Sequence, residues 1–244
     1  MRNAPSIFIR EMKAYFVSPI AYVVPMMFVL LTGIFFAGYF NDASRKGGIE
    51  ASMQWVFYDM SITMLFVAPL ITMRLFAEEK RSGTIEVLMT SPVTDSEVVI
   101  GKFAASLALF AIMLSLTFIC PFFLITYSDP GIAPIAVGYL GLFLLGTACF
   151  SLGTVTSSIT KNQIIAALVS FVILLALWLM GWVSRAMGAQ LGELGEIFSF
   201  ISLLEHFDDF SAGVLDTKHI VYYVSFTSFC LFLAVKSIQS AKWK

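Results

Sequence analysis

Three short stretches of this sequence hold residue types that could do chemistry. Four consecutive ionisable residues occupy positions 78–81, and three acids and a histidine crowd into positions 205–209. Carboxylates and imidazoles are common metal ligands. Gly101–Lys102 has the glycine–lysine pair of phosphate-binding loops. What each stretch can do depends on the element that positions it.

The glycine–lysine pair does not complete a phosphate-binding loop. That motif reads G-x-x-x-x-G-K-[ST], but Ser96 stands where the first glycine belongs and Phe103 follows Lys102. The HExxH and GxSxG motifs of hydrolytic enzymes do not occur in the sequence either. We therefore expect no catalytic residue and no cofactor in this chain, and we expect it not to be an enzyme by itself.

The acidic segment at 205–209 has a simpler interpretation than a metal site. Ser202 and Glu205 fit a capping box at the start of a helix. One side of that helix would carry the apolar residues Leu203, Phe207, Phe210 and Val214. The solvated side would carry the acids Glu205, Asp208 and Asp209. We expect an interfacial helix without a metal, and metal binding is the alternative.

The rest of the chain has the composition of a polytopic membrane protein. Of its 244 residues, 59% are hydrophobic and 13% are charged, against about 25% charged in a soluble domain. Long stretches without any ionisable residue alternate with short charged ones. We expect the lipid bilayer to surround this chain, and we expect no nucleic-acid partner.

Six apolar runs are each long enough to form a helix across a hydrocarbon core of about 30 Å. They lie at residues 19–40, 56–73, 98–127, 135–158, 164–183 and 220–235. Pro121 is expected to kink or end a helix inside the third run. The predicted fold is an all-α integral membrane protein with six transmembrane helices in one domain, residues 1–244.

The distribution of basic residues predicts the orientation. An even number of spans places both termini on one side of the membrane. Of the 15 Lys and Arg residues, only Arg45, Lys46, Arg185 and Lys218 lie in the connections on the opposite side. The positive-inside rule then predicts cytoplasmic termini and an outer location for residues 184–219.

Residues 1–18 predict a helix before the first span. Four apolar residues recur at helical spacing: Phe8, Met12, Tyr15 and Phe16. Arg10, Glu11 and Lys13 would point elsewhere, as in an amphipathic helix in the headgroup plane. Ser18–Pro19 would then turn the chain into the membrane. The alternative is a cytoplasmic extension of the first span.

Residues 74–97 predict a charged connection between spans two and three. Placing Glu78 to Arg81 at the bilayer centre would cost about 10 kcal/mol or more, so these residues must lie outside the lipid. Ser82–Gly83 would end the preceding helix. Thr94 and Glu97 fit a capping box that starts span three.

A short amphipathic helix is predicted inside this connection. Ile85, Leu88 and Met89 share one side, and Glu86 lies on another. A helix held between two spans suits the docking of a cytoplasmic partner. The alternative is an interfacial helix that binds no partner.

The fourth span carries a stripe of small residues at helical spacing: Gly146, Cys149, Gly153 and Thr156. Small side chains allow two helices to approach closely in lipid. The neighbouring helix could belong to the same chain or to a second copy, and packing within the chain is the simpler interpretation.

Three stretches resemble the membrane subunit of type 2 ATP-binding-cassette (ABC) exporters, in the branch associated with gliding motility and copper-enzyme maturation. They are FIREMKAYFVSPIAYV (residues 8–23), RLFAEEKRSGTIEVLMTSPVTDSEVVIGK (residues 74–102) and LLEHFDDFSAGVLD (residues 203–216). With the six spans, the resemblance covers nearly the whole chain. The middle stretch is the most specific of the three.

The resemblance implies a role for each stretch. The first would be an amphipathic elbow helix, and the third would correspond to partly inserted outer helices that cap the permease. The second would contain a coupling helix that docks a nucleotide-binding subunit. Its characteristic positions would be Glu78, Glu79, Arg81, Gly83, Thr84, Glu86 and Leu88.

The resemblance also implies partners. ATP and Mg²⁺ would be bound by separate P-loop nucleotide-binding subunits, and a second transmembrane subunit, identical or paralogous, would complete an exporter in the bacterial inner membrane. Two other functions remain open: an ATP-independent secondary transporter or channel, and a membrane anchor for a cytoplasmic ATPase that moves no substrate. The first of these would be expected to have ionisable residues at mid-membrane.

Overall fold

The computed structural model describes residues 4–45, 52–84, 93–128 and 130–241, without the side chains of residues 187–191, 194 and 241. Within these ranges every regular element is a helix. The helices are α1 (Ala4–Val17), α2 (Ile20–Arg45), α3 (Gln54–Thr72), α4 (Arg74–Ser82), α6 (Asp95–Leu116), α7 (Ile119–Tyr127), α8 (Ile132–Ile159), α9 (Gln163–Leu191), α10 (Glu193–Ile201), α11 (Glu205–Ser211) and α12 (Thr217–Ala241).

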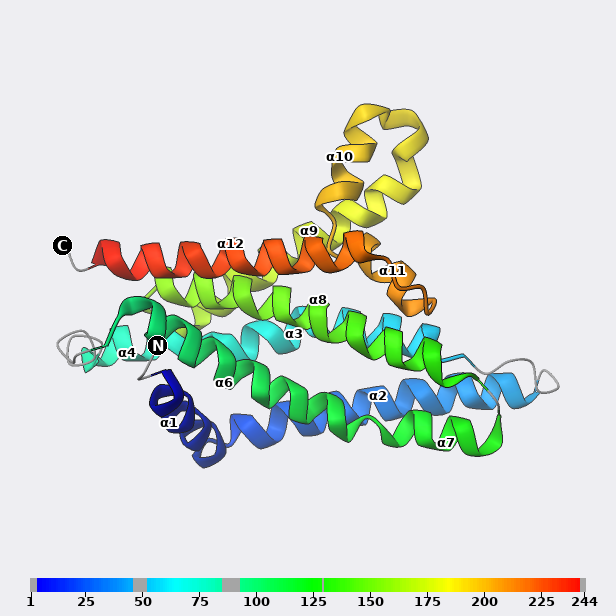
Figure 1. The fold of residues 1–244 in the computed structure, drawn as a ribbon, viewed down its shortest axis with the longest axis horizontal. Helices are drawn as coiled ribbons and strands as arrows, with labels where there is room; N and C mark the ends of the chain where they lie inside the picture. Colours follow the sequence, from blue (N-terminus) through cyan, green and yellow to red (C-terminus); the bar gives the residue numbers. More distant parts are fainter. Residues whose placement is uncertain (1–3, 46–51, 85–92, 129, 242–244) are drawn as a thin grey trace.

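The six predicted spans are confirmed among these described helices. Helices α2, α8, α9 and α12, and the consecutive pairs α3–α4 and α6–α7, are long and apolar enough to cross a membrane. The chain is therefore a multi-pass membrane protein. The spans run roughly along the long axis of the molecule (Figure 1). We call the half of the molecule that holds α1, α4 and the last turns of α12 the near end, and the other half, which holds α10 and α11, the far end (Figure 1).

The third span breaks earlier than Pro121, where the sequence predicted a kink. Helix α6 ends at Leu116 and α7 begins at Ile119, so Pro121 lies in the first turn of α7, where a missing N–H does no harm. Proline cannot donate to the carbonyl of Thr117, four residues before it. That carbonyl accepts instead from the Cys120 N–H at 3.0 Å and from the Tyr139 hydroxyl of α8 at 3.1 Å.

Helix α8 lies at the centre of the bundle because its small residues admit neighbouring helices at close range. It packs against α3, α4, α6, α9, α11 and α12. A Cβ atom on Gly146 would lie 2.1 Å from the Phe110 ring, and one on Gly153 would lie 2.0 Å from the Thr72 hydroxyl. The predicted stripe therefore packs inside this chain, as in its simpler interpretation.

The segment before the last span stands partly outside the bundle. The last turns of α9 and helix α10 form an arm that projects from the side of the molecule toward the far end (Figure 1). Helix α11 returns to the bundle and packs against α8 and α3. This arrangement leaves space between the arm and the beginning of α12.

Gly146 should tolerate no side chain. In Gly146→Ala the new methyl group would overlap the Phe110 ring, and overpacking of this kind costs about 1–3 kcal/mol. Gly38→Ala in α2 is the matched control because no atom lies within 4 Å of its Cβ position, and it should be neutral or stabilising by up to about 1 kcal/mol. Thermal unfolding of the purified protein in detergent compares the two. Equal melting temperatures would contradict this packing.

Candidate functional site

The charged end of the second span is set off from the span by a break in the helix. Helix α3 ends at Thr72 and α4 begins at Arg74. The Ser157 hydroxyl of α8 lies at this break, where it accepts from the Phe76 and Ala77 N–H groups at 3.0 and 3.2 Å. It also donates to the carbonyl of Met73 at 3.0 Å. One side chain of α8 therefore holds both sides of the break.

Helix α4 divides the four charged residues between two directions. The side chain of Glu78 is 56% exposed, whereas that of Glu79 is only 20% exposed. Lys80 donates to the backbone carbonyl of Ser158 in α8, and Arg81 is exposed. The sequence placed Glu78 and Glu79 in one docking surface. The structure turns Glu78 and Arg81 toward the surroundings, and Glu79 and Lys80 toward the protein.

Glu79 belongs to a buried ionic network that joins three helices. The Lys102 Nζ of α6 lies 2.9 Å from Glu79 Oε1 and 3.0 Å from Glu11 Oε1 of α1. Arg10 Nη2 lies 3.2 Å from the same Glu79 oxygen and 2.8 Å from Glu11 Oε1. We call these four residues the Lys102 clamp. It ties α1 and α4 to the first turns of the third span.

Burial makes the clamp sensitive to the loss of any partner. The Lys102 side chain is 1% exposed, and a buried ion is stable only when it is paired. Burial would raise the pKa of Glu11, but the charge of Lys102 and hydrogen bonds from Arg10 and Lys102 bring that pKa below its ordinary 4.5. Glu11 is therefore a carboxylate at neutral pH, as the clamp requires.

Arg74 adds a second connection between α1 and α4. Its Nη1 donates to the Ser18 hydroxyl at 2.6 Å, and its guanidinium lies 5.4 Å from the centre of the Tyr15 ring. The Tyr15 hydroxyl donates to the carbonyl of Ile71 at 3.2 Å. The chain turn between α1 and α2 is thus fixed to the α3–α4 break.

Helix α1 uses its predicted apolar side partly against the protein. Tyr15 is buried, Phe8 and Met12 pack against the core at half burial, and Phe16 is exposed. The prediction that Glu11 points away from the packed side is wrong, because Glu11 lies one turn before Tyr15 and its charge is neutralised by Lys102. Location in the headgroup plane stays a prediction.

The helix ends around the predicted coupling segment follow the sequence. Gly83 ends α4 with φ of 73°, a left-handed conformation that glycine adopts without strain. The Thr94–Glu97 capping box is present at the start of α6. Thr84 is exposed, with its hydroxyl 2.8 Å from that of Ser82. The predicted residues Glu86 and Leu88, and the short helix that contains them, lie outside the described residues.

The sequence analysis did not identify Lys102 as a functional residue, because it considered Lys102 only as part of a phosphate-binding loop. The feature that could have identified Lys102 is that it is a single lysine inside the third apolar run. A charge in such a run needs a partner from another helix. Only the fold shows that the partners come from residues 10–11 and 79.

Removing the central cation should destabilise the near end. In Lys102→Met the two carboxylates would keep only the half-exposed Arg10 as a counter-ion, and breaking a buried ionic pair costs about 3–5 kcal/mol. Adding Glu79→Gln should recover part of that loss because it removes one of the two charges. Lys236→Met is the control, as Lys236 is exposed and forms no ion pair among the described residues. Thermal unfolding measures all three, and a Lys102→Met protein as stable as the control would exclude the clamp.

The second candidate cluster lies at the far end, on α11 and α12. Helix α11 begins at Glu205, whose N–H donates to the Ser202 hydroxyl at 3.3 Å. Half of the predicted capping box is therefore present, while the Glu205 carboxylate accepts from Ser199 instead. Phe207 and Phe210 are fully buried, but Val214 is 55% exposed because α11 ends at Ser211. The predicted apolar stripe is wrong at that position.

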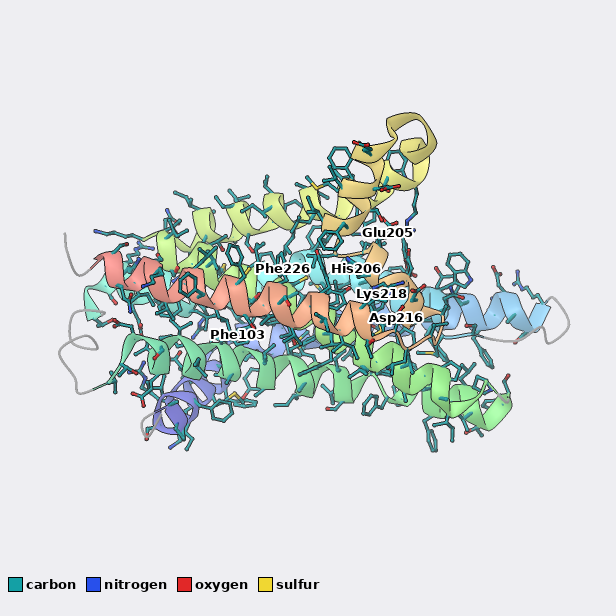
Figure 2. The ribbon with its side chains drawn as sticks, turned by 45° about the horizontal axis from the view of Figure 1, so that its top comes forward. Phe103, Glu205, His206, Asp216, Lys218 and Phe226 are labelled. Carbon is teal, nitrogen blue, oxygen red and sulfur yellow. The ribbon has the colours of Figure 1, made fainter. Side chains whose placement is uncertain are left out.

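Two histidines and an aspartate form a continuous hydrogen-bonded chain at this end. His206 Nε2 lies 3.0 Å from the Phe200 carbonyl, His206 Nδ1 lies 2.7 Å from His219 Nδ1, and His219 Nε2 lies 2.7 Å from Asp209 Oδ2. Figure 2 shows His206 beside the start of α12. The described residues contain no group of three or more His, Cys, Asp or Glu side chains placed to hold a metal ion.

The tautomer of His206 sets the direction of these bonds. The Phe200 carbonyl only accepts, so His206 Nε2 carries a hydrogen. Neutral His206 then accepts at Nδ1 from His219 Nδ1. A further proton on His206 would place hydrogens on both Nδ1 atoms and break this bond.

Acidification should weaken this chain of hydrogen bonds. Burial lowers the pKa of His206 below its ordinary 6.5, so its contribution to stability is complete above pH 6.5 and is lost as the pH falls through the folded-state pKa. The melting temperature of the protein should fall in that range. It should fall less in His206→Phe, which keeps an aromatic ring over Tyr222 but binds no proton. The comparison separates the pH dependence due to His206 from that due to Asp208, whose pKa is raised by burial. Equal dependence of the melting temperature on pH in the two proteins would refute the role of His206.

One family model covers both clusters. The family model described as ABC-2 family transporter protein matches residues 7–238. The match includes all four residues of the Lys102 clamp and the histidine–aspartate chain. Comparison with curated proteins gives no match.

Proposed function

This chain belongs to the ABC-2 family of transporter proteins, and on that premise we propose that it is the membrane subunit of an exporter driven by a separate nucleotide-binding subunit. That subunit binds ATP and Mg²⁺ and docks on residues 74–97. This chain supplies the membrane path and no catalytic residue. The resemblance of its three sequence stretches further supports the gliding-motility and copper-enzyme-maturation branch of exporters. In this proposal the near end lies in the cytoplasm of a bacterial cell. A second membrane subunit, identical or paralogous, lies beside this chain.

The observation that carries this proposal is the linkage of α4 to several helices at once. Its exposed side offers Glu78 and Arg81 to a partner. Its inner side is attached to α1 and α6 through the Lys102 clamp and to α8 through Ser157 and Ser158. A force applied to the exposed side of α4 therefore reaches three neighbouring helices directly.

The linkage suggests how ATP hydrolysis moves the spans. Packed helices shift as bodies because their interfaces resist continuous deformation. When the nucleotide-binding subunits close, α4 is displaced, and the clamp draws α1 and the start of the third span with it. The break between α3 and α4 lets α4 change direction without unfolding the second span.

Charge reversal at the exposed residue separates docking from folding. Glu78→Arg should weaken copurification of the nucleotide-binding subunit by about tenfold, because an attraction at the rim of the interface becomes a repulsion. It should also reduce the ATPase rate of the reconstituted complex. Stability should change little, since the Glu78 side chain is 56% exposed and its ion pair with Arg74 spans 3.8 Å.

Glu193→Arg at the far end is the control, because it makes the same charge change on an exposed residue of α10. Normal binding and normal ATPase coupling in Glu78→Arg would exclude docking through this side of α4. Normal binding without any ATP-dependent substrate movement in the unmodified protein would favour a membrane anchor over an exporter.

A further inference from the structure

An open pocket of about 1240 Å³ lies at the far end, between the α10 arm, α11 and α12. Its two ends differ in chemistry. One end is lined by charged residues at the beginning of α12 and on α11, and the other by aromatic residues further along α12. Figure 2 shows Glu205, His206 and Lys218 at the first end and Phe226 deeper along the helix. A ligand that fits both ends must be amphiphilic.

At the polar end one carboxylate oxygen, Glu205 Oε2, lacks a donor among the described residues. Asp208 and Asp209 are paired with Arg185 and His219, each at 2.7 Å. Glu205 forms no ion pair among the described residues. Its Oε1 accepts from the Ser199 hydroxyl at 2.7 Å, but its Oε2 is shielded from water and has no hydrogen-bond partner there. A shielded carboxylate oxygen without a donor is costly, and a bound cation with N–H groups would relieve that cost.

The apolar end follows one side of a membrane-spanning helix. Lys218, Tyr222, Phe226 and Phe229 recur at helical spacing along α12 and all line the pocket. The distance from the first to the last along the helix axis is about 16 Å at 1.5 Å per residue. That length is about half of the ~30 Å hydrocarbon core, or the depth of one leaflet. Phe229 is 60% exposed, so this side is open to an acyl chain.

We propose that this pocket binds a membrane lipid whose headgroup carries a primary ammonium, as in phosphatidylethanolamine. The Glu205 side chain turns toward the pocket so that the ammonium donates to Oε2. The phosphate lies toward Lys218, whose side chain is 63% exposed and pairs with Asp216 at 3.1 Å. One acyl chain lies along Phe226 and Phe229. The site is separate from the proposed docking of a nucleotide-binding subunit, which involves the near end.

The headgroup chemistry distinguishes this lipid from others. A carboxylate oxygen without a donor needs N–H groups, which a primary ammonium has and a choline headgroup lacks. Phosphatidylglycerol is anionic and has no cation to place beside Glu205. All three lipids have the same acyl chains available, so only the contacts at the polar end can discriminate among them.

Native mass spectrometry of the purified chain, without any partner, tests the proposal. Phosphatidylethanolamine, phosphatidylcholine and phosphatidylglycerol with identical acyl chains are added in equal amounts. Phosphatidylethanolamine should be retained about tenfold more than either competitor, the ratio given by one charge-assisted hydrogen bond of about 1.4 kcal/mol. Glu205→Gln should reduce its retention to that of phosphatidylcholine.

Two further variants separate headgroup recognition from folding and from general lipid adhesion. Glu193→Gln is the matched control, since Glu193 is exposed on α10 and is not among the residues that line the pocket; it should keep the preference. Phe229→Ser should reduce retention of all three lipids without changing their order. Equal retention of the three lipids by the unmodified protein, or an unchanged preference in Glu205→Gln, would overturn the proposal. Neither result depends on whether a nucleotide-binding subunit docks at the near end.

Discussion

A buried lysine ammonium is the constraint on which the near end of this protein depends. Lys102 is almost fully enclosed, so its charge requires partners, and the fold supplies Glu11 and Glu79 from two other helices. Each carboxylate in turn is paired with this lysine and with the half-exposed Arg10. The three helices therefore cannot separate without exposing an unpaired charge to a poorly solvating environment. This mutual dependence makes α1, α4 and α6 behave as one mechanical unit.

The unit is connected to the remaining helices by short polar contacts and close packing around α8. Ser157 satisfies two N–H groups at the α3–α4 break, and Gly146 and Gly153 admit Phe110 and Thr72 at distances that any side chain would prevent. In lipid, helix association depends on such close packing and on polar contacts between helices, since apolar burial gives little advantage there. A displacement of α4 is consequently transmitted to a rigid centre.

The two ends of the bundle divide the polar chemistry between them. At the near end the charges form ion pairs that hold helices together, which suits the proposed transmission of force from a nucleotide-binding subunit. At the far end His206, His219 and Asp209 form a chain of hydrogen bonds, and beside it Glu205 keeps one oxygen without a partner among the described residues. Glu79 Oε2 at the near end also lacks a hydrogen-bond partner among the described residues, but the pocket beside it has about 390 Å³ against about 1240 Å³ at the far end, so a lipid is proposed at the far end.

The sequence by itself determined the six spans, the turn at Ser18–Pro19, the end of α4 at Gly83 and the capping box at Thr94. These features follow from local rules: hydrophobic length, backbone freedom of glycine and the hydrogen-bonding reach of a capping side chain. The sequence could not show that Glu79 turns inward while Glu78 faces out, that Glu11 belongs to the packed side of α1, or that His206 meets His219. Those outcomes depend on contacts between residues distant along the chain, and only the packing of helices in three dimensions decides which charge finds which partner.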